Sequence, residues 1–582
     1  PADIQKFFYS ENGATLLLVQ FENPSAHAVT MQAQRTIKDI LRKDCFIGGM
    51  SAILEDTKFL VNQEMPVYIL CAVGACLVVL FLSMKETVVP LIFMLGMVFP
   101  IVYNFGTNIF LGQISYITEA LATVLQLGVT MDFSIFLLHR FEEEKRSCPD
   151  EDEAMVRAVQ KTFSSILASS LTTIAGFLAM CTMRLTLGRD IGIVMAKGVL
   201  LGVVSTVTIL PALILTFRRS IARHTHRTFI PKLRRTSRFV VRRYIPILAV
   251  FVLFFIPFSV AQAKTPVYYA LFDSLPQDLA GIQGTSRLKE DFGMTTSHFI
   301  IVDDGLPARD MEALTDEIEQ VDGIRQVLSY EKFLGGGVPR EVLPTEVRQI
   351  FCAGGHEMLL ANSSYESGTE AQNAQLDALN AIVKRYDPNG VITGETKDLI
   401  EVADVDFRSV SIASIAAVFL IIAISFRSAS IPVLLVAAIE SAIMINMGIP
   451  YFTGTTLPFV ASIVIGTIQL GATVDYAILM TTRFREELNA GRSTKDAVQT
   501  AVEQCSQSIL TSGLTFFAAT FSVSLASRME LISSLCRLIS RGALISMLVI
   551  LLVLPALLIL TAPLIRKTTY HWLSKEKETK TV

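Results

Sequence analysis

Two aspartates, Asp132 and Asp475, lie inside long apolar segments of the sequence. Each stands eight residues before the arginine that ends its segment, Arg140 or Arg483. Eight residues of helix rise by ~12 Å, so both carboxyl groups are expected near the middle of a bilayer. A charged carboxylate at that depth costs about 2.5–3.5 kcal/mol, and such acids usually face a bundle interior and have a function. Burial and a second carboxyl group nearby both favour the neutral acid, which suits these groups to binding and releasing protons.

Neighbouring residues are candidates to assist the two acids. Tyr476 follows one aspartate and could donate a hydrogen bond or relay a proton, whereas Phe133 follows the other, so the two sites cannot be chemically equivalent. A glycine four residues before each aspartate removes side-chain bulk and allows close approach of another helix. These glycines and the candidate polar partners are Gly128, Gly471, Ser169, Thr172, Thr173, Ser512, Thr515, Gln126 and Gln469.

The alternative for the two aspartates is a structural role. In that interpretation both acids stay protonated and hydrogen-bond Ser or Thr side chains on adjacent helices. The sequence offers no Lys or Arg at the same depth as a permanent counter-ion. The recurrence of the acid at the same position of two related segments favours a functional role.

The composition requires a membrane protein. Of the 582 residues, 51% are hydrophobic and 18% are charged, compared with about a quarter charged in ordinary soluble domains. The apolar residues form eleven segments long enough to span a ~30 Å hydrocarbon layer. These segments are 66–83, 88–110, 114–138, 163–182, 192–217, 244–262, 407–426, 430–450, 457–482, 506–525 and 538–563. Segments 150–162 and 493–505 are expected to be short amphipathic helices on the cytoplasmic surface. The net charge of −3 gives no basic field that would attract nucleic acid.

The membrane-spanning part is a tandem duplication. GVTMDFSIFLLHRFEEE (128–144) recurs as GATVDYAILMTTRFREE (471–487), offset by 343 residues. SILASSLTT (165–173) recurs as SILTSGLTF (508–516) at the same offset. Both copies have the same topology, so we expect them to be related by a pseudo-twofold axis along the membrane normal.

The distribution of charge favours one orientation. If the N-terminal residues are outside, nearly all Lys and Arg residues of the short connections are cytoplasmic, as the positive-inside rule requires.

The second copy begins with an extra helix and a long polar region that the first copy lacks, so we expect a further helix and part of a domain to precede this chain. The expected organisation is 1–65 and 263–405 as extracellular domains, the first incomplete, 66–217 and 406–565 as five-helix blocks, 218–243 as a basic cytoplasmic linker, 244–262 as the leading helix of the second half, and 566–582 as a cytoplasmic tail.

The polar region 263–405 has the pattern of two βαβ units, which predicts a ferredoxin-like domain. Residues 13–49 repeat the second unit as strand, helix and strand. Neither region contains a Ser/His/Asp, Cys/His or metal-ligand constellation. The sequence therefore predicts no enzymatic activity, no metal site and no cofactor.

These patterns together resemble a known family. The segments LQLGVTMDFSIFLLHRFEEE and IQLGATVDYAILMTTRFREE, with five helices repeated after each extracellular domain, resemble the resistance-nodulation-division superfamily and its MMPL-type transporters of Gram-positive bacteria. The resemblance implies a polytopic α-helical membrane protein with porter-type α+β domains, in the plasma membrane. It further implies proton-driven export of lipids or other hydrophobic and amphiphilic molecules. Family members carry the proton on Asp–Tyr pairs, which map onto Asp132 and onto Asp475 with Tyr476. Phe133 departs from the usual tyrosine, so a symmetric relay of two pairs is not expected.

Two other functions fit the same architecture, because a fold does not fix a function. One is a sterol-sensing or receptor-like protein that binds lipid without pumping it, and the other is an accessory factor for protein translocation. The expected partners are protons, an amphiphilic substrate and membrane lipids, without nucleic acid. The substrate, the number of protons per cycle and the oligomeric state stay open.

Overall fold

A computed structural model describes residues 8–10, 12–230, 233–269, 275–330, 332, 351–393, 396–570 and 572. The chain divides into two compact units. The first contains Pro1–Leu60 and Tyr268–Glu401, and the second contains Val61–Val267 and Val402–Val582. Of the predicted cytoplasmic tail 566–582, residue 571 and residues 573–582 lie outside the described residues.

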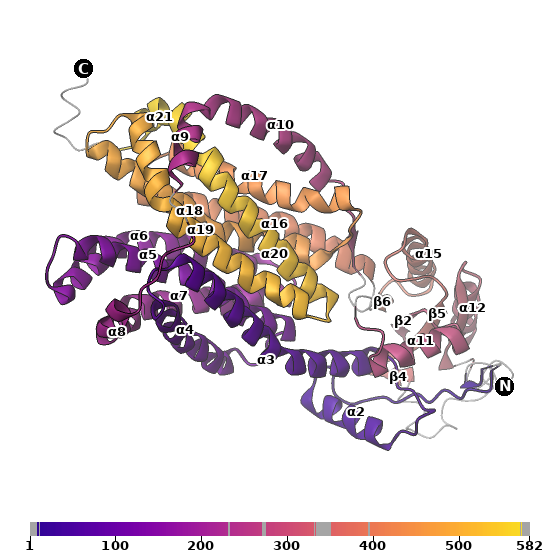
Figure 1. Cartoon of the computed structure of the whole chain (residues 1–582). Helices are drawn as coiled ribbons and strands as arrows, with labels where there is room; N and C mark the ends of the chain where they lie inside the picture. Colours follow the sequence, from indigo (N-terminus) through magenta and orange to yellow (C-terminus); the bar gives the residue numbers. More distant parts are fainter. Residues whose placement is uncertain are drawn as a thin grey trace. The chain divides into compact units, whose positions relative to one another are not determined.

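The first unit contains an antiparallel sheet with two connecting helices (Figure 1). Its strands are β2 (Thr296–Asp303), β3 (Ile324–Leu328), β5 (His356–Ser363) and β6 (Val391–Thr393), in the order β3-β5-β2-β6, with β4 (Cys352–Ala353) beside β5. Helix α12 (Ala308–Glu319) joins β2 to β3, and α15 (Glu370–Tyr386) joins β5 to β6. Helices α2 (Ala28–Ile40) and α11 (Ala280–Phe292) complete the unit. This strand order is the ferredoxin-like one, so the fold predicted for 263–405 is confirmed.

Alternation along the strands explains how this sheet builds a core. Ile300 and Val302 on β2 and Leu359 and Ala361 on β5 are buried on one face, because every second side chain of a strand points the same way. The apolar faces of α12 and α15, which include Met311, cover that face.

Asp387 fixes the turn between α15 and β6. Its carboxylate accepts hydrogen bonds from the backbone N–H groups of Asp303 at 2.9 Å and Asn389 at 2.8 Å. Burial alone would raise the pKa of Asp387, but the backbone donors outweigh burial and hold the pKa below its usual value.

We expect Asp387→Asn to destabilise the first unit at neutral pH. The amide keeps only one acceptor oxygen, so one hydrogen bond worth about 1–2 kcal/mol is lost. Because the folded-state pKa of Asp387 is lowered, its contribution is complete above the unfolded-state pKa near ~4 and is lost as the pH falls through the folded-state value. Thermal unfolding should therefore show a Tm difference from wild type that shrinks between pH 7 and pH 3. The exposed Asp316→Asn is the control, and an equal difference at both pH values would contradict the prediction.

The N-terminal segment differs from the prediction. The helix expected within 13–49 is present as α2, but the two strands expected there are absent from the described residues 12–49. Only an isolated bridge joins Tyr9 and Thr15, and the side chain of Leu17 is 83% exposed. A strand is stable only beside hydrogen-bonded partner strands, so an alternating sequence alone was insufficient evidence.

The second unit is a bundle of long helices. Within the described residues, eleven helices are long and apolar enough to cross a membrane, which confirms the predicted number of spans. The first repeat contains α3 (Met50–Ser83), α4 (Val89–Gly106) with the turn η1 (Thr107–Leu111), α5 (Tyr116–Lys145), α6 (Glu151–Ala179) with the turn η2 (Met180–Thr182), and α7 (Thr186–Thr216). The second contains α16 (Thr396–Phe426), α17 (Ser430–Thr453), α18 (Phe459–Asn489), α19 (Thr494–Ala526) and α20 (Glu530–Leu548), which continues through a π-helical turn (Val549–Val553) into α21 (Leu554–Thr568). Between the repeats lie α8 (Arg218–Arg223), α9 (Arg234–Arg242) and the long apolar α10 (Tyr244–Gln262). The short strands β1 (Val267–Tyr268) and β7 (Leu457–Pro458) precede α11 and α18, respectively.

The segments 150–162 and 493–505 are not separate surface helices, so that prediction was wrong. They are the first turns of α6 and α19, which run on without a break into the apolar spans. Ser493 and Asp150 cap the two helices by accepting a backbone N–H, and no Gly or Pro interrupts the chain at the change in polarity. The change from an amphipathic to an apolar pattern therefore occurs within one continuous helix and does not mark the end of a helix.

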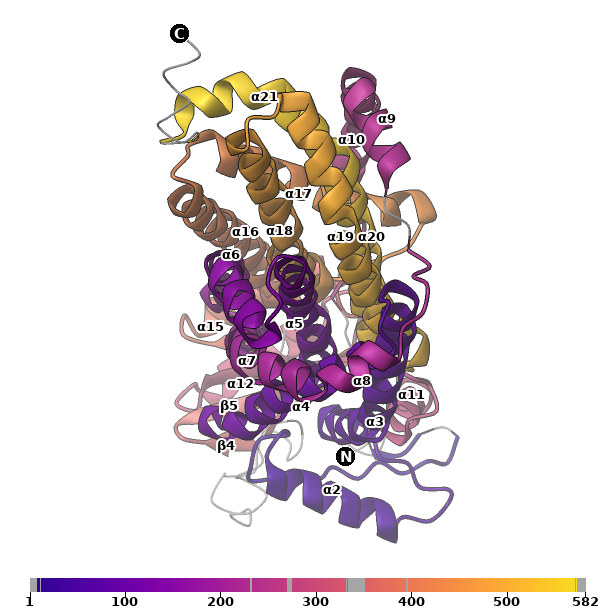
Figure 2. The same ribbon diagram turned by 60° about the vertical axis from the view of Figure 1, so that its left-hand side comes forward.

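Helices α5 and α18 form the centre of the second unit (Figures 1 and 2). Nearly nine-tenths of the most apolar stretch of each is buried, compared with about one-twentieth for α10. Helix α5 packs against α6, α7 and α19, and α18 packs against α6, α19 and α20. The two helices that carry the intramembrane acids are thus enclosed by protein on most sides.

Candidate functional site

The aspartates lie at matching positions of the two central helices. Asp132 is sixteen residues after the first residue of α5, and Asp475 is sixteen residues after the first residue of α18. Only 9% of Asp132 and 8% of Asp475 is exposed. Both carboxyl groups line one cavity, together with residues of α6 and α19.

The surroundings of Asp132 come from the second repeat. Ser512 on α19 hydrogen-bonds the carboxyl oxygen Oδ1, and the phenol of Tyr476 on α18 hydrogen-bonds the same carboxyl group. The hydroxyl oxygens of Ser512 and Tyr476 are 2.8 Å apart. A serine hydroxyl has one proton, so Ser512 can donate to the Asp132 carboxyl group or to the phenol oxygen of Tyr476, but not to both at once. The three groups form a short chain along which a proton can move.

The surroundings of Asp475 come from the first repeat. Thr173 on α6 has its Oγ1 at 3.4 Å from both carboxyl oxygens and donates to the backbone oxygen of Gly471 at 2.9 Å. Ser169, one turn earlier on α6, also hydrogen-bonds the carboxyl group. Each acid is therefore held by hydroxyl groups of the opposite repeat.

Each acid is hydrogen-bonded to an equivalent serine, but the second hydroxyl partner differs between the two sites. Ser169 and Ser512 correspond under the 343-residue offset, but Thr173 corresponds to Phe516. In place of the hydroxyl that Phe516 lacks, Asp132 has the phenol of Tyr476. No Lys or Arg side chain bonds either carboxyl group within the described part of the chain.

The cavity at the aspartates adjoins a second, charged cavity. The first has a volume of about 50 Å³, enough for more than one water molecule. The second shares Phe136, Ser165, Leu479 and Ser508 with the first. A row of small hydroxyls and two apolar side chains therefore separates the aspartates from the charged end of the bundle.

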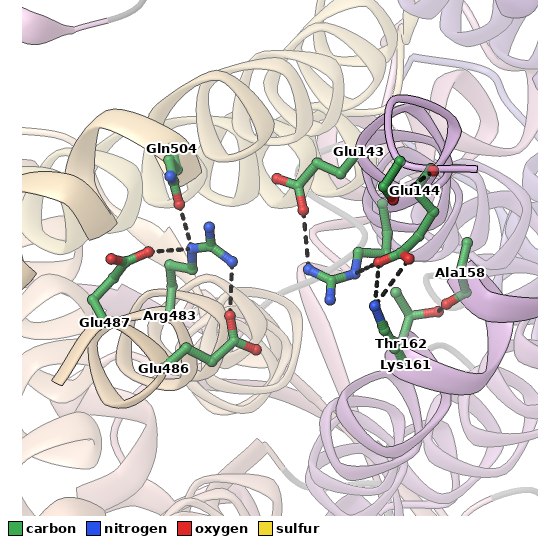
Figure 3. Close-up of polar contacts among 11 residues, drawn as sticks. Glu143, Glu144, Ala158, Lys161, Thr162, Arg483, Glu486, Glu487 and Gln504 are labelled. Carbon is green, nitrogen blue, oxygen red and sulfur yellow. Dashed lines mark hydrogen bonds and ion pairs between the residues drawn. The ribbon is translucent and has the colours of Figure 1, made fainter. Parts of the chain in front are cut away.

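Two duplicated arginine–glutamate clusters lie at the charged cavity, which Arg140, Glu143, Arg483 and Glu486 line (Figure 3). In the second repeat Arg483 pairs with Glu486 at 2.7 Å and Glu487 at 3.3 Å. In the first repeat Arg140 pairs with Glu143 at 3.0 Å and Glu144 at 3.2 Å, and Lys161 also reaches Glu144. Figure 3 shows the two clusters facing one another, and we call this cavity the charged vestibule.

His139 also lines the charged vestibule, and sequence reasoning missed it. Its Nδ1 is 2.5 Å from the hydroxyl of Ser508 on α19, one of the residues shared by both cavities. Thr482 stands at the equivalent position of the second repeat, so the duplication gave no signal for a histidine there. The imidazole is therefore hydrogen-bonded to a hydroxyl group that lines both cavities.

Four predicted polar partners bond elsewhere. Thr172 and Thr515 donate to backbone oxygens of their own helices. Gln126 and Gln469 each accept a hydrogen bond from an asparagine on the preceding helix and donate to a glycine oxygen on α7 or α20. The groups concerned are Asn104 and Gly198 in the first repeat and Asn446 and Gly542 in the second. The two glutamines thus hold the helices of each repeat together, whereas the two threonines bond only within their own helices.

The two predicted glycines have different neighbours. Gly471 faces the backbone of Thr173, and a Cβ built at 471 would lie 3.5 Å from the Thr173 oxygen, an ordinary contact. A Cβ built at Gly128 would overlap the ring of Phe516, which is fully buried. Close helix approach is thus present at both positions, but only one is sterically tight.

The described residues hold no cluster of three or more His, Cys, Asp or Glu side chains that could bind a metal ion. The site consists of two buried acids hydrogen-bonded to hydroxyl groups, an arrangement that can take up, hold and pass protons.

Comparison with known proteins shows the family of the chain. A model of the MMPL family matches residues 1–247 and 276–579. The chain is 26% identical over 391 residues to the putative membrane protein ActII-3 of Streptomyces coelicolor, covering 64% of this chain and 52% of that protein. It is 21% identical to the membrane protein YdfJ of Bacillus subtilis, covering 70% and 57%, and 22% identical to the probable transport protein MmpL12 of Mycobacterium tuberculosis, covering 49% and 26%. The chain thus spans about half the length of the first two relatives.

The fold is also similar to a solved structure. The crystal structure of SecDF, a translocon-associated membrane protein from Thermus thermophilus, matches with a TM-score of 0.57 at 14% identity, covering 86% of this chain and 62% of that one. The likeness concerns the fold. The duplicated bundle, the paired aspartates and the family match over most of the sequence lead to one conclusion: the chain is a multi-pass membrane protein that belongs to the MMPL family.

Proposed function

We propose that the protein is a secondary transporter that uses the proton gradient to export lipids or other amphiphilic molecules across the cell membrane. The observation that carries the proposal is the pair of buried aspartates, each hydrogen-bonded to hydroxyl groups of the opposite repeat. A proton bound or lost at either acid changes a contact between the repeats. Proton transfer is thereby tied to the packing of one repeat against the other.

The charged vestibule supports a direction for the proton. The positive-inside rule favours an arrangement in which the end of the bundle with Arg140 and Arg483 is cytoplasmic and the first unit is extracellular. Protons would then reach the aspartates from outside and leave past Ser508 and His139 into the vestibule. Each charge moved through 100 mV supplies ~2.3 kcal/mol, to which the pH gradient adds.

The relatives support transport as the class of function, since one is described as a probable transport protein. Lipid or amphiphile as substrate follows from the resemblance of the repeats to MMPL-type transporters. The extracellular unit, in the predicted orientation, would receive the substrate from the outer leaflet or from between the repeats.

Proton flux in proteoliposomes tests the proposal. With pyranine trapped inside and an acid jump outside, the protein should acidify the lumen faster than protein-free vesicles do. Lipid that copurifies with the protein, identified by mass spectrometry, should be exported from energised cells, and an uncoupler should stop this export. Copurified lipid without proton flux would favour a receptor, and impaired protein secretion with unchanged lipid export in a deletion strain would favour a translocation factor.

A further inference from the structure

A buried carboxylate on α16 binds the start of α7. Asp406 is fully buried, and its two oxygens accept the backbone N–H groups of Arg184 at 2.8 Å and Leu185 at 3.0 Å. Leu185 is the N-cap of α7 and provides no side-chain cap of its own. A carboxylate suits this position, because the first amides of a helix lack partners within the helix and carry a partial positive charge. Asp406 thus joins α16 of the second repeat to the α6–α7 connection of the first.

A second carboxylate makes the corresponding contact in the other direction. Glu64 on α3 accepts the backbone N–H of Arg528 at 3.3 Å, in the connection between α19 and α20. Tyr68, one turn later on α3, hydrogen-bonds the same carboxyl oxygen and lies 2.8 Å from the hydroxyl oxygen of Ser527. Glu64 thus joins α3 of the first repeat to the α19–α20 connection of the second.

The two contacts are equivalent in place and unequal in strength. Both bridge opposite repeats, as the contacts at the aspartates do. Asp406 has both oxygens bonded, whereas Oε1 of Glu64 is buried and has no hydrogen-bond partner among the described residues. A buried carboxylate with one unpaired oxygen is costly, so the Glu64 contact is the more easily released of the two.

Helices α6 and α19 connect the surroundings of the aspartates with the two carboxylate contacts, so a shift of either helix would reach those contacts. Helix α6 carries Thr173 at Asp475 and leads to the connection that Asp406 binds, about 16 Å further along. Helix α19 carries Ser512 at Asp132 and leads to the connection that Glu64 binds, about 22 Å further along. Helices α3 and α16 are those within which the chain passes between the two units.

We propose that Glu64 and Asp406 are positioning residues that couple the aspartate pair to helices α3 and α16. A shift of α6 or α19, caused by a change in protonation at the aspartates, is transmitted through these carboxylates to the helices that lead into the first unit. Glu64 is the contact that opens and closes, and Asp406 is the fixed one. This inference rests on the proton-driven transport proposed above.

Hydrogen exchange at a single pH tests the coupling. Wild type and the double variant Asp132→Asn/Asp475→Asn, a mimic of the neutral pair, are compared in detergent at pH 8.5. Exchange at residues 54–63 of α3 should differ by about fivefold or more between them. In the Glu64→Gln background this difference should disappear. The exposed Asp404→Asn, on α16 two residues from Asp406, is the matched control and should leave the difference intact.

Proton flux by the pyranine assay separates the possible failures. Glu64→Gln should retain the flux of wild type, because the aspartates and their hydroxyl partners are unchanged, whereas misfolding would remove the flux as well. An α3 response that survives Glu64→Gln, or a flux that falls in parallel with the response, would overturn the coupling role. Absence of flux in wild type would instead overturn the proposed transport. Asp406→Asn provides a second variant, which should raise exchange at residues 184–188, because the amide leaves one of the two backbone N–H groups at the start of α7 without its acceptor.

Discussion

Asp132→Asn and Asp475→Asn, made separately, should each lower proton flux and substrate export by about 100-fold or more. Asparagine has nearly the shape of a neutral aspartic acid and can bond the same hydroxyl groups, so the bundle should fold. It cannot bind and release a proton. If the proton passes through both acids, the loss of either one breaks the route even though the other is intact.

A matched control separates this effect from a general effect of removing an acid. Glu119 lies in the first turn of the same helix as Asp132 and away from the cavity, so Glu119→Gln should retain nearly full flux. Flux is measured with pyranine in proteoliposomes, and folding by size-exclusion chromatography and thermal unfolding. Undiminished flux in a well-folded Asp132→Asn or Asp475→Asn protein would refute the proposed route through that acid.

Gly128→Ala should be strongly destabilising, whereas Gly471→Ala should be close to neutral, although the two glycines are equivalent in the repeat. The added methyl group at 128 overlaps the buried ring of Phe516, and overpacking of this kind costs about 1–3 kcal/mol. At 471 the same methyl group makes an ordinary contact of 3.5 Å with the backbone of Thr173. Thermal unfolding of the two variants in detergent should therefore give a clear Tm loss for the first only.

A compensating change tests the steric explanation. Gly128→Ala combined with Phe516→Leu should recover much of the lost stability, since the smaller side chain leaves room for the new methyl group. Gly471→Ala combined with Phe516→Leu should show only the Tm loss that Phe516→Leu causes by itself. Equal Tm losses for the two alanine variants would contradict the packing at Gly128.

The matching positions of the aspartates along their helices and the duplication were accessible from the sequence, because both depend on local pattern. Eight residues between an acid and a terminal arginine measure depth along one helix, and the 343-residue offset needs no knowledge of packing. Candidate hydroxyl partners could be named from the sequence, but which acid each of them contacts could not. Ser512 and Thr173 come from the repeat opposite to the acid they contact, and a sequence repeat gives no information about which copy faces which.

Helix geometry explains why the two glutamines do not bond the aspartates. Gln126 stands six residues before Asp132, and six steps of about 100° place it on another face of α5. Gly128 stands four residues before Asp132, on nearly the same face, and both contact α19, at Phe516 and Ser512. Counting residues in turns of 3.6 would have separated these cases.

Each acid is hydrogen-bonded by hydroxyl groups of the opposite repeat, and this arrangement bears on how such a chain could arise. A symmetric dimer of one repeat would contain two identical copies of each contact, because a twofold axis repeats every interaction. In such an ancestor, a phenol beside one acid would require a phenol beside the other. Joining the repeats in a single chain removes that constraint. Tyr476 and Phe133, or Thr173 and Phe516, could then diverge, so that two carboxyl groups with a common origin came to lie in different surroundings.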